Sequence, residues 1–241
     1  MSRVPVAVAG ATGRMGSLVA RTLESAPGFT LVARPVRGAL DADWGGARLV
    51  ADFTSPAGTA QLADLAAARG IGLLVGTTGL DEAAQAAIAR ASSRVPVLVA
   101  PNLSLGVAAL ARAIRAAVSA LPDYDVEIVE RHHAAKVDSP SGTALALVRV
   151  VENARDRAGA LRAGREGRVG PRPKGEIGIH SLRGGSWVGE HSVVLAGPHE
   201  TIELTHVAHD RAAFAEGALT ALRFLAGAAP GAYALEDALV S

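Results

Sequence analysis

The first hundred residues alternate between short, wholly apolar runs and stretches whose apolar residues recur at helical spacing. The first run is VPVAVAG, Val4 to Gly10, and it is followed along the chain by FTLVA, ARLVADF, IGLLVG and VPVLVA. Strands that are apolar throughout need cover on both faces, and parallel sheets receive that cover from their crossover helices. Because such crossovers are right-handed, the alternation predicts a doubly wound parallel sheet of the Rossmann type.

The pattern changes after Asn102, which we take as the end of a first domain at residues 1–102. Two predicted helices, LGVAALARAIRAAVSAL and SGTALALVRVVENARDRAG, flank the strand-like run DVEIVERHH. After REGRVGPRPKGE, expected to be a mobile loop, the alternating segments IGIHSLRGG, SWVGEHSVVLAG and TIELTHVAHD predict an antiparallel meander. The predicted fold class is therefore α/β, with an α+β second domain at 103–210 that contains a mixed or antiparallel sheet. RAAFAEGALTALRFLAG closes the chain as an amphipathic helix.

The overall charge and composition exclude several classes of protein. The formal net charge is +1 and charged residues make up 20% of the chain, which is not typical of a nucleic-acid-binding or disordered protein. The chain contains no cysteine, which excludes disulfides and thiolate chemistry. The sequence shows no signal peptide and no apolar run long enough to span a membrane, so we expect a cytoplasmic protein without membrane or nucleic-acid partners.

The segment AVAGATGRMGSLVA places Gly10, Gly13 and Gly16 at the turn from the first strand into the first helix. Glycines at such a turn let the backbone approach a pyrophosphate, and the helix N-terminus offers N–H groups to the phosphates. The spacing G-x-x-G-x-x-G has one residue more in its first gap than the common dinucleotide fingerprint. The context favours a dinucleotide cofactor, with a tight turn that binds no ligand as the alternative.

The end of the second predicted strand bears on the choice between NADPH and NADH. An acid usually stands there and binds the adenosine ribose hydroxyls. TLVARPVRG contains no acid, and the first acid after this segment is Asp41. Arg34 and Arg37 stand in this segment instead, and arginine suits a 2′-phosphate. We therefore expect NADPH to be preferred over NADH, with two solvated arginines in an arginine-rich chain as the alternative.

Three further strands end in small or polar turns, and ligands of open parallel sheets bind beyond the carboxyl ends of the strands. These turns are DFTSP (52–56), GTTG (76–79) and APNLS (100–104). They are expected to line the nicotinamide side, where Thr77 and Thr78 could donate hydrogen bonds and Asn102 could hold a carboxamide. Ordinary turn chemistry would explain the same residues.

The stretch EIVERHHAAKVDSPSGTAL contains one of only two lysines in a chain rich in arginine. His132 and His133 follow a strand-like run, and we expect both in a loop beyond it, where they could exchange protons near neutral pH. Lys136 adds a compact cation, and Ser141–Thr143 open a helix whose N–H groups can bind a carboxylate. The cluster suits a small anionic substrate, although a structural histidine and a serine helix cap are the alternatives.

Two other kinds of site fit the sequence poorly. The remaining histidines lie scattered without helical ligand spacing or a nearby acid cluster, so we expect no metal site. They are His180, His191, His199, His206 and His209. The Tyr-x-x-x-Lys pair of short-chain dehydrogenases is absent, because Ile128 and Asp237 stand four residues after the two tyrosines.

At this point the sequence resembles the dihydrodipicolinate reductase family, also called 4-hydroxy-tetrahydrodipicolinate reductase, along nearly the whole chain. GATGRMG is similar to the family's cofactor loop, and DFTSP, GTTG and APNLSLGV to its nicotinamide-side turns. ERHHAAKVDSPSGTAL is similar to its signature segment, and REGRVGPRPKGEIGIHSLRGGSWVGEH to a later pattern. The resemblance implies NAD(P)H-dependent reduction of 4-hydroxy-tetrahydrodipicolinate to tetrahydrodipicolinate, with loss of water, in diaminopimelate and lysine biosynthesis.

The resemblance also implies roles for individual residues. His132 and Lys136 would handle protons, and the substrate, a cyclic dicarboxylate, would contact a second group of residues. That group is His133, Ser141, Gly142 and Thr143. The cofactor-binding residues would be Gly10, Ala11, Thr12, Gly13, Arg14, Met15, Gly16, Arg34, Arg37, Gly76, Thr77, Thr78, Ala100, Pro101, Asn102 and Leu103.

The resemblance carries further expectations about assembly and cofactor choice. The final helix, in 211–241, would complete the nucleotide domain, and the chains would form a homotetramer. Family members that use NADH well carry an acid just before the arginine after the second strand, whereas Val36 precedes Arg37 here. Two other classes stay open: a related NADPH oxidoreductase with a different imine or amino-acid substrate, and a non-catalytic NADP(H) sensor.

Overall fold

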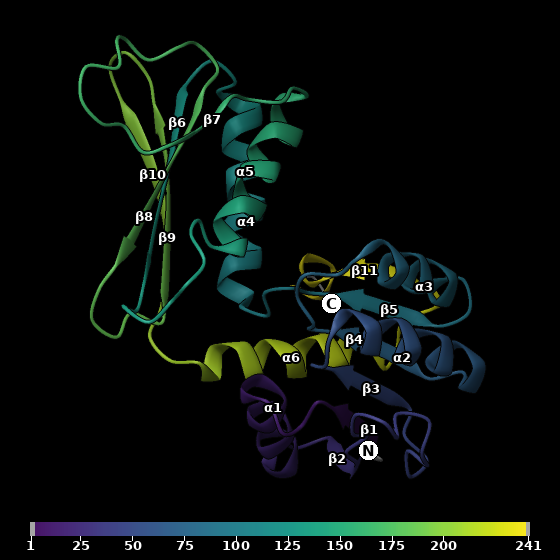
Figure 1. Ribbon diagram of the computed structural model, residues 1–241. Coiled ribbons are helices and arrows are strands. Elements are labelled where there is room, and N and C mark those ends of the chain that lie inside the picture. Colours follow the sequence, from purple (N-terminus) through teal and green to yellow (C-terminus); the bar gives the residue numbers. More distant parts are fainter. Residues whose placement is uncertain (1–2, 240–241) are drawn as a thin grey trace. The chain divides into compact units, whose positions relative to one another are not determined.

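The computed structural model describes residues 3–239, which form two compact units. The first unit extends to Leu105 and resumes at Ala212, and the second unit is Gly106–Arg211. Each unit contains one β-sheet with helices packed against it (Figure 1). The chain therefore leaves the first unit once and returns to it for the closing segment.

The sheet of the first unit has six parallel strands in the order β11-β5-β4-β3-β1-β2. The strands are β1 (Val4–Ala9), β2 (Phe29–Ala33), β3 (Leu49–Asp52), β4 (Gly72–Val75), β5 (Pro96–Val99) and β11 (Gly231–Ala234). Every residue of β3 and β4 is buried, as in a parallel sheet covered on both faces. The predicted doubly wound sheet is confirmed, and the chain winds outward from β1 in both directions.

Four helices cover this sheet, with α2 and α3 packed together on one side and α1 and α6 on the other (Figure 1). They are α1 (Arg14–Ser25), α2 (Pro56–Arg69), α3 (Glu82–Ser92) and α6 (Ala212–Leu225). The Oγ atom of Ser55 accepts from the backbone N–H of Gly58 and caps α2, while Asp81 caps α3 through the N–H of Ala84. The helices thus begin a few residues after the strand ends, which places the intervening turns at one edge of the sheet.

The closing segment packs tightly into the first unit. Gly217 of α6 lies so close to the backbone of Leu103 that a Cβ added to it would stand 1.7 Å from the Leu103 carbonyl oxygen. Beyond α6, β11 adds to the edge of the sheet beside β5, and the 3₁₀-helix η1 (Leu235–Leu239) follows it. Strand β11 was not predicted, because GAYA is a short run of small residues without a clear strand pattern.

The second unit contains a mixed five-stranded sheet in the order β10-β9-β6-β8-β7. The strands are β6 (Asp125–His132), β7 (Leu161–Ala163), β8 (Ile177–Arg183), β9 (Gly189–Ala196) and β10 (Thr201–Ala208). Helices α4 (Leu105–Ala120) and α5 (Gly142–Arg155) lie side by side over one face, where they bury an aliphatic core that includes Ile128, Ile179 and Val193 (Figure 1).

The predicted antiparallel meander is only partly correct. Strands β9 and β10 form an antiparallel hairpin as expected, but β8 does not pair with β9. Strand β6 lies between them, parallel to β8 and antiparallel to β9. This arrangement brings the carboxyl ends of β6 and β8 together, next to the start of β9.

The other face of this sheet carries an ion-pair network centred on Glu127. Arg165 and Arg172, from the segment expected to be a mobile loop, both bind the Glu127 carboxylate, and His180 lies 2.8 Å from it. Burial opposes ionisation of Glu127, but the hydrogen bonds from these three side chains lower its pKa to about 2. Two points of the loop are therefore tied to the sheet.

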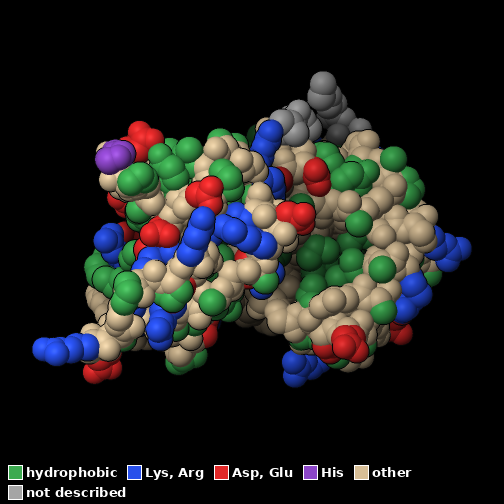
Figure 2. Space-filling model, turned by 90° about the horizontal axis from the view of Figure 1, so that it is seen from above, with side chains coloured by type: hydrophobic (Ala, Val, Ile, Leu, Met, Phe, Trp, Pro, Cys, Tyr) green, Lys and Arg blue, Asp and Glu red, His purple; other side chains and the backbone are tan. Residues whose placement is uncertain are grey.

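The surface and the helix lengths add two further observations. On the face seen in Figure 2, blue lysine and arginine side chains are interspersed with red acidic ones, in keeping with the net charge of +1. Within residues 3–239, no helix combines the length and apolar character needed to cross a bilayer.

Candidate functional site

The glycine turn after β1 is built by close backbone contacts. Gly10 has a φ of +76°, and a Cβ on it would lie 2.3 Å from the carbonyl oxygen of Phe53. A Cβ on Gly16 would lie 2.2 Å from the carbonyl oxygen of Gly10. These approaches draw the turn against the end of β3 and let α1 begin directly below it, so glycine is required at both positions.

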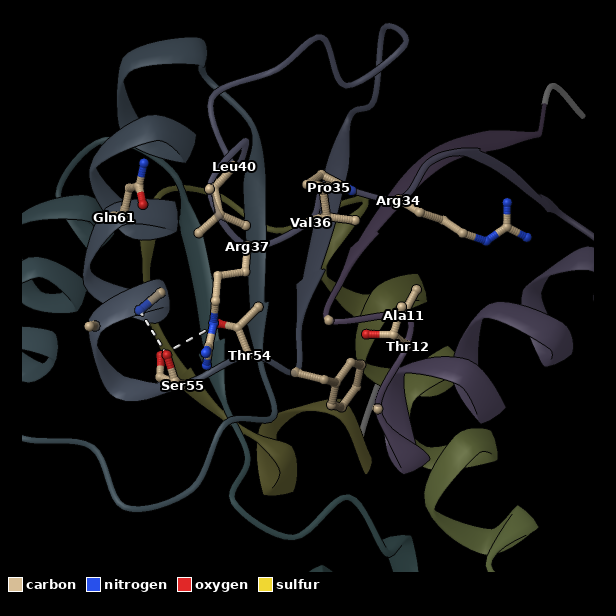
Figure 3. Close-up of a pocket in the computed structure, with 16 residues that line it drawn as sticks. Ala11, Thr12, Arg34, Pro35, Val36, Arg37, Leu40, Thr54, Ser55 and Gln61 are labelled. Atoms are coloured by element: carbon tan, nitrogen blue, oxygen red, sulfur yellow. Dashed lines mark hydrogen bonds between the residues drawn. The ribbon is translucent and has the colours of Figure 1, made fainter.

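A cavity of about 900 Å³ opens beside this turn (Figure 3). Its walls come from the glycine turn, from the segment after β2, from the segment between β3 and α2, and from the first turns of α2. The lining residues are Gly10, Ala11, Thr12, Gly13, Arg34, Pro35, Val36, Arg37, Gly38, Leu40, Phe53, Thr54, Ser55, Ala57, Gly58 and Gln61. No acidic side chain is among these sixteen residues, so the cavity suits an anionic ligand.

The two predicted arginines behave differently at this cavity. Arg34 forms an ion pair with Glu24, and Figure 3 shows its guanidinium directed away from the cavity. Arg37 instead extends toward Ser55, at the N-terminus of α2 (Figure 3). Arg37 is therefore the better placed of the two to meet a phosphate in the cavity.

The turns predicted for the nicotinamide side lie outside this cavity, apart from the DFTSP turn. Phe53, Thr54 and Ser55 line this cavity together with Arg37. The side chain of Thr77 is buried and accepts a hydrogen bond of 3.0 Å from the N–H of Thr54.

The remaining predicted residues of these turns have structural contacts of their own. The Oδ1 atom of Asn102 accepts from the N–H of Ser104 at 2.8 Å, which stabilises the turn after β5. A Cβ on Gly76 would lie 2.3 Å from the ring of Phe53. The first unit thus joins its GTTG and DFTSP turns through Phe53 and Thr54.

The second unit contains a polar cluster at the carboxyl ends of β6 and β8, centred on Glu130. The Glu130 side chain is fully buried, and Arg183 binds it with both terminal nitrogens at 2.8 Å. The Nδ1 atom of His132 lies 2.5 Å from Oε2 of Glu130, and the backbone N–H of Ser141 donates to Oε1 at 3.1 Å. One carboxylate therefore connects a histidine, an arginine and the start of α5.

The charges of this cluster follow from its contacts. Burial opposes ionisation of Glu130, but hydrogen bonds from Arg183 and His132 lower its pKa to about 2. The pKa of His132 is lowered below 6.5, first by burial and further by the charges of Lys136 and Arg183, although Glu130 opposes this. A neutral imidazole thus lies beside a fixed carboxylate and two cations.

Ser141 links the cluster to the helix and to a second histidine. Its Oγ atom caps α5 by accepting from the N–H of Ala144 at 3.1 Å, and it lies 3.1 Å from Nε2 of His191. Burial lowers the pKa of His191 to about 4, so this ring is neutral at neutral pH. Gly142 and Thr143 are the first two residues of α5, at the positive end of its dipole.

Lys136 and His133 lie in the turn that follows β6. Lys136 donates to both carboxylate oxygens of Asp138, at 2.7 and 2.9 Å, and one fifth of its side chain is exposed. The backbone N–H of His133 donates to the carbonyl of Trp187, and that of Lys136 to the carbonyl of His133. The turn thus places a cation next to His132.

The sequence prediction for this segment needs one correction. His132 and His133 were both expected in a loop, but His132 is the last residue of β6 and only His133 lies beyond the strand. Glu130, Arg183 and His191 were missed as site residues. The available signal was the spacing of Glu130 and His132, because residues two apart in a strand share one face.

The two units define a class of protein: a Rossmann-type fold followed in the chain by an α+β domain with a polar cluster that contains histidine, lysine, arginine and glutamate side chains. Within residues 3–239, no group of three or more His, Asp or Glu side chains is arranged to hold a metal ion. The chain belongs to the dihydrodipicolinate reductase family. Residues 4–103 match the family model for the N-terminus of dihydrodipicolinate reductase, and residues 106–239 match the model for its C-terminus.

Curated relatives support this membership over nearly the full length. The chain is 43% identical to a 4-hydroxy-tetrahydrodipicolinate reductase of Anaeromyxobacter sp. (strain Fw109-5), over 98% of this chain and 97% of the relative. It is 45% identical to the protein of the same name from Thermomicrobium roseum, over 96% of this chain and 98% of the relative.

Solved structures share the fold at low sequence identity. A dipicolinate-bound dihydrodipicolinate reductase from Paenisporosarcina sp. TG-14 has a TM-score of 0.79 at 20% identity, with 98% of this chain and 99% of that chain covered. GenD2 from gentamicin A biosynthesis, in complex with NAD, has a TM-score of 0.59 at 17% identity, with 99% and 91% covered. These likenesses describe the fold.

Proposed function

We propose that the protein is a 4-hydroxy-tetrahydrodipicolinate reductase, which uses NAD(P)H to form tetrahydrodipicolinate with loss of water in diaminopimelate and lysine biosynthesis. The observation that carries the proposal is the Glu130 cluster, which connects His132, Arg183 and the start of α5. The cluster offers a proton-exchanging group, cations and a helix N-terminus, which together suit an anionic ring substrate. Family membership supplies the identity of that ring.

The first unit fits a pyridine dinucleotide. The glycine turn leaves no room for a Cβ at Gly10 or Gly16, and the cavity beside it is of the size that cofactor pockets have. When bound, the cofactor supplies the hydride for the reduction. Residues 10–16, with Arg14, would hold the pyrophosphate, and the turns 76–78 and 100–103 would frame the nicotinamide.

NADPH is proposed as the preferred cofactor, with NADH as the second. The support is Arg37, which extends along a cavity wall that contains no acid, and which could bind a 2′-phosphate. Arg34 contributes less, because its guanidinium is already paired with Glu24. Gln61, which also lines the cavity, is a neutral hydrogen-bonding group for the adenosine.

The second unit is proposed to bind the substrate and to manage its protons. One carboxylate of the ring would accept hydrogen bonds from the N–H groups of Gly142 and Thr143, with Ser141 and His133 nearby. Lys136 and His132 are the proton-exchanging groups beside this helix start. The substrate hydroxyl would leave as water together with a proton from the neighbouring ring carbon, and hydride would then add to the carbon that lost the hydroxyl. Lys136, or His132 once it has taken up a proton, would return a proton to the neighbouring carbon.

A homotetramer in the cytoplasm is proposed for the working state. The support for assembly is the helix-free face of the five-stranded sheet, where Leu182 and Val207 are 39% and 40% exposed. An edge and face of this kind gain from being covered by another chain. Light scattering combined with size-exclusion chromatography measures the mass, and a monomer at assay concentration would contradict the tetramer.

A coupled assay tests the activity. Aspartate semialdehyde, pyruvate and dihydrodipicolinate synthase generate the substrate, and the loss of nicotinamide absorbance is followed with NADPH and with NADH. We expect oxidation of NADPH that depends on the synthase. NADPH binding without turnover would favour a non-catalytic sensor, and turnover only with another imine or amino acid would favour a different oxidoreductase.

A further inference from the structure

We propose that Glu130 is a positioning residue for this reaction: its carboxylate accepts the Nδ1 proton of His132 and so leaves Nε2 as the ring atom that exchanges protons. The inference rests on the proposed function for its kinetic consequence. Its structural core, the tautomer of His132, can be tested without any activity.

The assignment of the tautomer starts from the charge of Glu130. The Glu130 side chain is fully buried, but it is ionised because Arg183 binds it with both terminal nitrogens and the backbone N–H of Ser141 donates to it. An ionised carboxylate accepts hydrogen bonds and has none to donate. The contact of 2.5 Å with His132 therefore requires a proton on Nδ1, and a neutral imidazole then carries its lone pair on Nε2.

The backbone near Nε2 of His132 leaves space beside this atom, as proton exchange at Nε2 requires. Gly189, at the start of β9, is the neighbour of this atom, and a Cβ added there would stand only 3.1 Å from Nε2. The absence of a side chain at this position leaves room beside the ring. The side chain of His132 is 12% exposed, so the ring is enclosed on its other sides.

The charged and titratable groups that face His132 come from each element packed against it. Glu130 lies on the same strand, Arg183 on β8 and Lys136 in the following turn, and the ring of His191 on β9 packs edge-on at 5.2 Å. Only Glu130 favours the protonated imidazole, while the two cations oppose it. The carboxylate thus orients the ring and also keeps its affinity for a proton from falling further.

Glu130 also contacts the segments that are proposed to bind the substrate. Oε1 of Glu130 accepts from Ser141, the N-cap of α5, and the second guanidinium nitrogen of Arg183 bridges Glu130 to the carbonyl of Asp138. Through these bonds Glu130 ties the end of β6 to the turn that carries Lys136 and to the helix start. The substitution Glu130→Gln keeps the shape but offers an amide N–H that can meet Nδ1, which favours the other tautomer.

The test compares Glu130→Gln with Glu127→Gln in the full-length protein. Glu127 is a matched control, because it lies on the same strand, is bound by two arginines and a histidine, and also has a pKa of about 2, but faces the opposite side of the sheet. We expect Glu130→Gln to lower kcat by about 10- to 10³-fold. In Glu130→Gln, the limb of the kcat–pH profile that reflects the titration of His132 should move to lower pH. Glu127→Gln should keep the wild-type kcat and the wild-type pH profile.

A measurement on the wild-type protein covers the case in which Glu130→Gln does not fold. Nitrogen-15 NMR of the histidine rings, with the His132 signals assigned by their loss in His132→Gln, reports which nitrogen carries the proton. Protonated Nδ1 and unprotonated Nε2 at neutral pH support the proposal, and the opposite tautomer overturns it. Equal losses of kcat in both glutamine variants, with an unchanged pH profile, would also overturn it.

The outcomes separate this inference from the proposed function. A wild-type protein that shows the Nδ1–H tautomer but never oxidises NADPH in the coupled assay would contradict the function and leave the tautomer standing. An active wild type whose Glu130→Gln variant has normal kcat and an unshifted pH profile would contradict the inference alone.

Discussion

The Oγ atom of Ser141 lies 3.1 Å from Nε2 of His191 while it accepts a hydrogen bond from the N–H of Ala144. One hydroxyl therefore caps α5 and contacts a buried ring whose pKa is lowered, mainly by burial, to about 4. The N-terminus of α5, which is proposed to bind a substrate carboxylate, is thus in contact with an uncharged imidazole through Ser141.

The buried His191 makes stability depend on pH. Its folded pKa of about 4 lies below the unfolded value of 6.5, so the unfolded chain binds more protons between these values. The free energy of unfolding should therefore fall as the pH decreases from 6.5 to 4, by on the order of 3 kcal/mol. The carboxylates of Glu127 and Glu130, with pKa values of about 2, add losses only below about pH 4.5.

Urea unfolding at pH 7.5 and pH 5.0 measures this dependence. The His191→Gln variant should show a clearly smaller difference between the two pH values than the wild type, with His132 retaining part of it. His199→Gln, at an exposed position, serves as the control and should keep the wild-type difference. A difference that survives unchanged in His191→Gln would place the pH dependence elsewhere.

The contribution of Ser141 to stability can be separated from its proposed contribution to substrate binding. Ser141→Ala should lower the free energy of unfolding by about 1 kcal/mol for the lost N-cap, and by about 1–3 kcal/mol more because Nε2 of the buried His191 loses its partner. Asp81→Ala removes the cap of α3 in the other unit and should cost only the N-cap contribution, about 1 kcal/mol. Only Ser141→Ala should also weaken the binding of dipicolinate, measured by isothermal titration calorimetry. Equal affinities in the two variants would remove Ser141 from the proposed substrate site.

Arg37 is expected to set the cofactor preference. Arg37→Gln should raise KM for NADPH by about 10- to 100-fold, the equivalent of a charged hydrogen bond, and leave KM for NADH nearly unchanged. Arg34→Gln is the matched control, because this arginine stands three residues earlier and is paired with Glu24. Steady-state kinetics with both cofactors decides the point, and a comparable rise in both variants would contradict a specific contact of Arg37 with the 2′-phosphate.

The parallel sheet was accessible from the sequence because each strand from β1 to β5 is a local apolar run that needs no distant partner to be recognised. The neighbours of β6 were not accessible in this way. Its pairing with β8 and β9 joins segments about fifty or more residues apart, and the alternation within β8 and β9 does not specify which strand lies between them.

The residues of the candidate site were also predicted only in part. His132, Lys136 and Ser141 stand close together in one segment, so a local pattern revealed them. Arg183 and His191 reach the cluster from β8 and β9, and only the strand order brings them to Glu130. An acid next to a basic run is usually solvated, and the burial of Glu130 became visible only with its partners in place.

Lys136 offers the sharpest test of the proton-transfer assignment, since the chain contains only one other lysine. Lys136→Ala should lower kcat by about 10²- to 10⁴-fold, the usual span for general acid catalysis. Lys136→Arg should restore little, because a guanidinium keeps the charge but does not give up its proton. Lys174→Ala is the control: that side chain is 80% exposed, lies 3.4 Å from Asp123, and its loss should leave kcat unchanged. Near-normal turnover in Lys136→Ala, with dipicolinate affinity reduced, would assign Lys136 to substrate binding and leave the proton to His132.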